Sequence, residues 1–153
     1  MNKFKNQDST FNGIKFKSKL EISCYKKLIE AGFNPEYEKQ KFVLFNGFKL
    51  PENVAYFTQL KTNNEGKIHT IFKNDTRKIR DITYLPDFYF TYKEYEIYFD
   101  TKGKANDVYP LKKKLFLNML NNIATQTGKK YLFFEPHNVK QIKESILIIQ
   151  NLK

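Results

Sequence analysis

Two neighbouring strand-like segments constrain the fold of this chain most strongly. Residues 82–92 and 95–102 are both rich in aromatic and β-branched residues, and only Lys93 and Glu94 separate them. A connection this short is typical of a β-hairpin, in which the two strands are hydrogen-bonded neighbours. We therefore expect Asp87, in the first strand, to lie close to the end of the second.

Charged side chains meet in that hairpin. Asp100 and Lys102 flank Thr101, so the period-two geometry of a strand places the carboxylate and the ammonium on one face. The carboxylates of Asp87 and Asp100 are hard oxygen ligands suited to Mg²⁺ or Mn²⁺, and a neighbouring lysine can orient or help to deprotonate an attacking water. The alternative is a proline turn at Asp87 and a solvent-exposed ion pair between Asp100 and Lys102. The apolar flanks of both segments favour the metal site, because buried charges need partners or metals.

Glu21 is a further acidic candidate, on a helix predicted over residues 18–31. Ser18 and Glu21 have the spacing of a capping box, and Gly32 ends the segment. At about 100° per residue, Glu21 falls inside the apolar arc of the helix, beside Cys24. It is therefore either a capping acceptor or an inward-facing residue of a site.

A second helix is predicted over residues 110–125, with Pro110 in its first turn and Gly128 beyond its end. Helical phasing places Lys112 on the apolar side and Lys114 on the solvent side. Lys112 either extends from the edge of the core to water or faces a cluster of acids or a phosphate.

The remaining segments define an α/β chain. Residues 37–45 alternate like a strand, residues 46–79 form an inserted hairpin region, residues 131–134 form a short apolar strand, and residues 139–152 form a final helix. A length of 153 residues suits one domain with its own core. We predict a single domain over residues 1–153, with a mixed β-sheet flanked by helices in the order α-β-β-β-α-β and then a C-terminal helix.

The charge balance indicates a polyanionic partner. Lys and Arg total 27 against 16 Asp and Glu, which gives a net charge of +11 and a pI near 9.6. Such a field favours nucleic acid, although an AT-rich genome also raises lysine usage. Around the candidate site the basic side chains that could follow a phosphate backbone are Lys104, Lys113 and Lys114.

Cysteine, histidine and hydropathy exclude several classes of protein. The single cysteine, Cys24, excludes an internal disulfide and a cysteine-based zinc site. His69 and His137 lie far apart in the sequence, which gives little support to a histidine-dependent nuclease. No segment approaches the roughly 18 apolar residues of a membrane span, so we expect a cytoplasmic chain with no membrane partner.

Together the motifs resemble the PD-(D/E)xK nuclease superfamily. Its pattern is a glutamate on a first helix, then PD, then DxK, then a basic helix, and these parts correspond to Glu21, Pro86-Asp87, Asp100-x-Lys102 and Lys112. Over roughly residues 10–120 the chain looks like a small phage-encoded family of endonucleases, related to RecU-type Holliday-junction resolvases. The longer matching segments are Gly13-Ile14-Lys15-Phe16, Gln40-x-Phe42-x-Leu44, Ile82-Thr83-Tyr84 and Tyr109-x-x-Lys112-x-Lys114-Leu115-Phe116.

The resemblance implies a restriction-endonuclease-like core and Mg²⁺- or Mn²⁺-dependent hydrolysis of DNA, with branched DNA among the expected substrates. It implies metal ligation by Asp87, Asp100 and the Thr101 carbonyl, and water activation by Lys102. Many relatives carry Glu where this chain has Asp100, a change that shortens the ligand by one methylene.

The resemblance also implies a supporting or second-metal role for Glu21, and it gives Lys112 the task of holding the scissile phosphate or neutralising its charge. Resolvases of this fold act as dimers, so a homodimer is a further expectation. The rival hypothesis is a nuclease-fold DNA-binding module or phage structural factor without turnover. The joint presence of Glu21, Asp87, Asp100 and Lys102 speaks against that rival.

Overall fold

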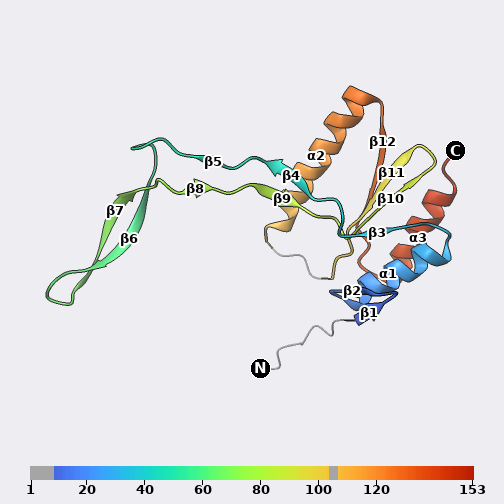
Figure 1. The fold of residues 1–153 in the computed structure, drawn as a ribbon, viewed down its shortest axis with the longest axis horizontal. Coiled ribbons are helices and arrows are strands. Elements are labelled where there is room, and N and C mark those ends of the chain that lie inside the picture. Colours follow the sequence, from blue (N-terminus) through green and yellow to red (C-terminus); the bar gives the residue numbers. More distant parts are fainter. Residues whose placement is uncertain (1–8, 104–106) are drawn as a thin grey trace. The chain divides into compact units, whose positions relative to one another are not determined.

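The hairpin expected at Lys93 and Glu94 is present, at the centre of a four-stranded sheet (Figure 1). The computed structural model describes residues 9–103 and 107–153. In sheet order the strands are β12 (Lys130–Phe134), β11 (Tyr95–Phe99), β10 (Phe88–Tyr92) and β3 (Glu36–Tyr37). β10 is antiparallel to both β11 and β3, whereas β11 and β12 are parallel. The expectation of a mixed sheet is therefore confirmed.

The chain divides into two compact units. We call Met1–Phe42 together with Tyr84–Lys153 the sheet unit, and Val43–Thr83 the ribbon unit. The helices α1 (Lys19–Glu30), α2 (Tyr109–Thr127) and α3 (Val139–Gln150) all belong to the sheet unit. They lie within a residue or two of the helices expected from the sequence.

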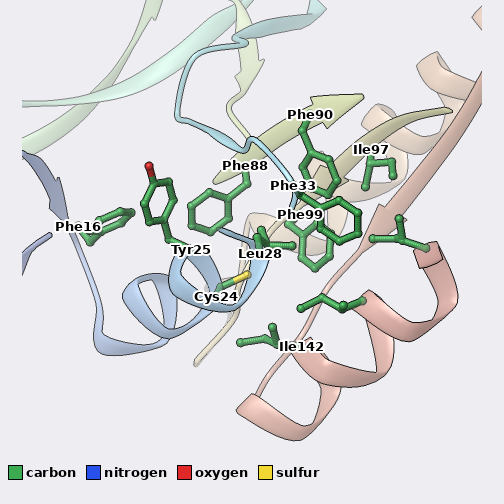
Figure 2. Close-up of a cluster of buried hydrophobic side chains, with 12 residues drawn as sticks. Phe16, Cys24, Tyr25, Leu28, Phe33, Phe88, Phe90, Ile97, Phe99 and Ile142 are labelled. Atoms are coloured by element: carbon green, nitrogen blue, oxygen red, sulfur yellow. The ribbon is translucent and has the colours of Figure 1, made fainter. Parts of the chain in front are cut away.

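Helices α1 and α3 pack on one face of the sheet, where the apolar side chains of both helices and of the strands meet (Figure 2). Leu28 of α1, Phe88 of β10, Phe99 of β11 and Ile142 of α3 are all fully buried in this cluster. Phe16 of the small N-terminal hairpin, β1 (Ser9–Phe11) with β2 (Ile14–Phe16), joins them. The apolar arcs read from the sequence therefore do face a common core.

Helix α2 packs on the opposite face. Tyr98 lies between Ile97 and Phe99 in β11, so its side chain points away from the α1 and α3 side. Its ring contacts Phe116 of α2 at 5.4 Å between centroids, and Phe116 also contacts Phe133 of β12. The sheet is thus covered by helices on both faces.

The strand expected over residues 82–92 is wrong in one respect, because it is two strands. β9 (Ile82–Tyr84) pairs with β4 (Phe42–Phe45), and β10 begins only at Phe88. Pro86 lies in the break and has no N–H group for a sheet hydrogen bond, which is why one continuous strand cannot form. Asp87 therefore occupies the bend just before β10.

The strand expected over residues 95–102 is also shorter, since β11 ends at Phe99. The backbone nevertheless continues beside the segment after β12. The Asp100 amide donates to the Phe134 carbonyl and the Lys102 amide to the Pro136 carbonyl, each at 3.0 Å. These bonds hold the Asp100 to Lys102 segment in place without a regular strand.

The ribbon unit contains antiparallel pairs of strands. β6 (Tyr56–Thr62) and β7 (Ile68–Asn74) form a long antiparallel ribbon, and β5 (Phe48–Lys49) pairs with β8 (Lys78–Ile79) (Figure 1). The single strand expected over residues 37–45 is wrong, because β3 ends at Tyr37 and β4 begins only at Phe42. Within the described residues, no helix combines the length and the apolar character needed to cross a membrane.

Candidate active site

Asp100 is the most deeply buried charged residue of the candidate site, at 1% exposed. The hydroxyl of Tyr84 donates a hydrogen bond to Asp100 Oδ2, and the ammonium of Lys102 forms an ion pair with Oδ1. Burial raises the pKa of Asp100, and the Lys102 and Tyr84 partners oppose that shift. The surrounding structure therefore stabilises a carboxylate that burial alone would disfavour.

Lys102 lies on the same side as Asp100, as the alternation predicted. Its side chain is 22% exposed, and its ammonium lies over the ring of Tyr109, 4.2 Å from the centroid. The Tyr109 hydroxyl donates to Glu135 Oε2 at 2.6 Å, and Lys113 Nζ donates to the same oxygen at 2.8 Å. The lysine is therefore held between a carboxylate and an aromatic face that is itself anchored.

Asp87 is joined to the same segment by Thr101. The Thr101 amide and hydroxyl both donate to Asp87 Oδ2, each at 2.7 Å. Burial, followed by the negative charge of Asp100, raises the pKa of Asp87 to about 7, and the charge of Glu21 adds to the shift. Lys102 acts in the opposite direction. The aspartates and the lysine thus form one electrostatically coupled group.

Glu21 lies in the first turn of α1 and is buried. Its amide donates to Ser18 Oγ at 3.1 Å, which is the first half of the expected capping box. The residue is only 7% exposed, and its Oε2 accepts hydrogen bonds from the Lys17 amide at 2.9 Å and the Tyr37 hydroxyl at 2.6 Å. Ser18 therefore caps α1, whereas the Glu21 carboxylate bonds the amide of Lys17 in place of that of Ser18 and faces inward.

The donors fit a hard divalent ion in part. Over residues 9–103 and 107–153, no three or more Asp, Glu, His or Cys side chains converge closely enough to hold a metal ion by themselves. Asp100 Oδ1 is buried, and its neighbour among the described residues is the Lys102 ammonium, with which it forms an ion pair. Mg²⁺ commonly binds through one or two carboxylates and completes its shell with water and substrate phosphate. Asp87 and Asp100 suit that mode.

The comparisons with known proteins place the chain in a family. Residues 1–134 match a family model described as "Protein of unknown function (DUF1064)", well over half of the chain. The chain belongs to the DUF1064 family. No curated protein and no solved structure gives a significant match.

The DUF1064 match contains every site residue expected from the sequence and ends at Phe134, immediately before Glu135. The sequence did not single out Tyr84, Tyr109 or Glu135 as site residues. Tyr109 belongs to a motif noted above, but its contact with Lys102 depends on the orientation of α2, which a motif does not encode.

The α2 lysines differ in their surroundings. Lys112 is half-buried, as its phase on the helix predicted, and Lys114 is exposed. Lys113, expected to contact DNA, is paired with Glu135 and is one-third exposed. Lys104 lies outside the described residues.

Proposed function

We propose that this DUF1064 protein is a Mg²⁺- or Mn²⁺-dependent endonuclease that hydrolyses DNA phosphodiester bonds. The observation that carries the proposal is the buried Asp100 paired with Lys102 and coupled to Asp87. Buried charged groups are costly, and a purely structural role is better filled by apolar side chains. A perturbed carboxylate beside a lysine is typical of catalytic sites.

The fold supports the same proposal. The sheet unit supplies a helix, an antiparallel hairpin, a second helix and a parallel strand, with the charged residues at the bend before β10 and the end of β11. This order agrees with a restriction-endonuclease-like core, which we include in the proposal.

In the proposed reaction, Asp87, Asp100 and the Thr101 carbonyl would hold the divalent ion. When bound, that ion supplies Lewis acidity to the phosphate and lowers the pKa of a water. Lys102 orients the water through a hydrogen bond from its ammonium. The water oxygen forms a bond to phosphorus and gives up a proton to solvent, the bond from phosphorus to the leaving sugar oxygen breaks, and that oxygen accepts a proton from solvent.

Other residues support these groups. The ring of Tyr109 and the carboxylate of Asp100 limit the positions open to the Lys102 ammonium. Glu21, with Oε2 already bonded, acts on the site through its charge. Lys112 and Lys114 are the α2 cations available for a phosphate backbone.

The test is DNA cleavage with Mg²⁺, Mn²⁺ or EDTA, on linear, supercoiled, single-stranded and branched substrates. We expect metal-dependent cutting that falls by at least about 10²-fold in Asp87→Asn, Asp100→Asn and Lys102→Met, because each change removes several kcal/mol of transition-state stabilisation. Asp107→Asn is the matched control, since Asp107 is exposed and lies close to Asp100 and Lys102 in the sequence.

Circular dichroism at the assay temperature checks that each variant is folded. A wild-type protein that binds DNA and cuts none of these substrates with either metal would refute the enzyme and leave a nuclease-fold binding module. Full activity in the Asp100→Asn protein would refute the proposed site.

A further inference from the structure

One face of the ribbon formed by β6 and β7 carries large apolar side chains that are exposed to solvent. Residues directly opposite each other in the ladder share a face, and Thr58 opposes Phe72, Leu60 opposes Thr70, and Thr62 opposes Ile68. We call this set the apolar face: Tyr56, Thr58, Leu60, Thr62, Ile68, Thr70, Phe72 and Asn74. Its large members are Tyr56, Leu60, Ile68 and Phe72, exposed by 55%, 68%, 70% and 78%.

The charges of the ribbon lie on its other face. Lys61 opposes His69, and Lys73 opposes Phe57. Phe57 is half-buried, with the guanidinium of Arg77 over its ring at 4.5 Å. Neither strand contains an acidic residue. The ribbon therefore has one face without charge and a second face, called the basic face, that carries its cations together with the half-buried Phe57 and Ile71.

We infer that the apolar face packs against the same face of a second copy of this chain. A two-stranded hairpin by itself is marginally stable in water, and an exposed apolar patch usually marks a contact surface. Two ribbons packed face to face would bury Leu60, Ile68 and Phe72 in a small sandwich. That contact would give the ribbon the core it otherwise lacks.

The charge pattern favours an identical partner. A two-fold contact brings the same surface patch together from both chains, so the patch must match itself. The apolar face meets this condition because it carries no charge, and the cations Lys61 and Lys73 point outward on both copies. A nucleic acid is a poorer fit to this face, since backbone binding depends on lysine and arginine.

The test is the molar mass of the full chain by light scattering over a range of concentrations. We expect twice 18.3 kDa at high concentration and dissociation on dilution. Leu60→Ser combined with Phe72→Ser should give a monomer at concentrations where the wild type is dimeric. The matched control is Gln59→Ser with Lys61→Ser on the basic face, which should remain dimeric.

A second measurement tests the dimer even if the β6–β7 hairpin unfolds in the double serine variant. A cysteine at position 70 (Thr70→Cys) should react with a maleimide more slowly as protein concentration rises, whereas Lys73→Cys on the basic face should react at a constant rate. Cys24 is fully buried, and the wild type supplies its background rate.

A wild type of 18.3 kDa at every concentration, or protection of position 70 that does not depend on concentration, would overturn the inference. So would a monomer whose apolar-face variant loses affinity for DNA or for phospholipid vesicles, because the face would then serve that ligand. None of these results depends on DNA cleavage, so failure of the dimer is separate from failure of the nuclease.

Discussion

The sheet unit and the ribbon unit use similar apolar residues with opposite outcomes. In the sheet unit, Leu28 and Phe99 are completely buried between strands and helices (Figure 2). In the ribbon unit, Leu60 and Phe72 are 68% and 78% exposed. The difference comes from the number of layers: the four-stranded sheet has helices on both faces, and the ribbon has only its two strands.

This contrast separates what each unit can do. The candidate site places Asp87 and Asp100 largely out of water, and only a well-packed surrounding structure can hold charged groups there. The ribbon has no such core among the described residues, but it offers an extended surface to a partner. We therefore propose that the sheet unit carries the chemistry and that the ribbon unit carries the association.

Truncating one leucine in each unit should give the largest contrast. Leu28→Ala leaves a cavity in the core and should lower the free energy of unfolding by about 2–5 kcal/mol. Leu60→Ala removes an exposed side chain and should change it by no more than about 0.5 kcal/mol in dilute protein. Urea unfolding followed by circular dichroism measures both.

The same two variants can be compared at different protein concentrations. If the apolar face is covered by a second copy, the cost of Leu60→Ala should grow as concentration rises, whereas the cost of Leu28→Ala should not. Equal costs for the two variants in dilute protein would mean that the ribbon has a core of its own and that the contrast is wrong.

A smaller effect is expected at Gly47, in the ribbon unit. A Cβ atom added there would lie 2.4 Å from the Ile79 carbonyl oxygen and 2.8 Å from the Asp81 nitrogen. Because both are backbone atoms, Gly47→Ala must displace the chain near β5 and β8, at a cost of about 1–3 kcal/mol. Hydrogen exchange should show faster exchange in β5 and β8, with the amides around Leu28 unchanged. Gly103→Ala, where a Cβ meets nothing within 4 Å, is the control.

Sequence patterns predicted those features of the sheet unit that depend on residues close together in the chain. Ser18 caps α1 as its spacing from Glu21 indicated, and Gly128 ends α2 with a left-handed backbone, φ 69°. The tight connection at Lys93 gave the hairpin, and alternation gave the pairing of Asp100 with Lys102. Each of these features depends on residues only a few positions apart.

The rest depended on contacts between distant segments. The break at Pro86 could have been anticipated from its missing N–H group, but the contacts of Tyr84 and Tyr109 with the Asp100 and Lys102 pair required the positions of β9 and α2. In the ribbon, Leu60 and Phe72 follow the same alternation as buried strand residues. Alternation reports which side chains share a face and says nothing of whether a second layer covers that face.

The pH dependence of stability should have opposite signs in the two units. The pKa of Asp87 is raised to about 7 from an ordinary 3.8. The contribution of Asp87 to the free energy of unfolding is therefore complete below about pH 4 and is lost as the pH rises to 7. Hydrogen bonds from Arg77 lower the pKa of Asp75 to about 2, so its contribution is complete above about pH 4 and is lost as the pH falls towards 2. Asp87→Asn should therefore flatten the change in Tm between pH 4 and 7 by on the order of a few degrees, and Asp75→Asn should alter only the change below pH 4. Thermal unfolding in EDTA measures both, and an unchanged slope between pH 4 and 7 in Asp87→Asn would show that the sheet unit does not hold this carboxyl out of water.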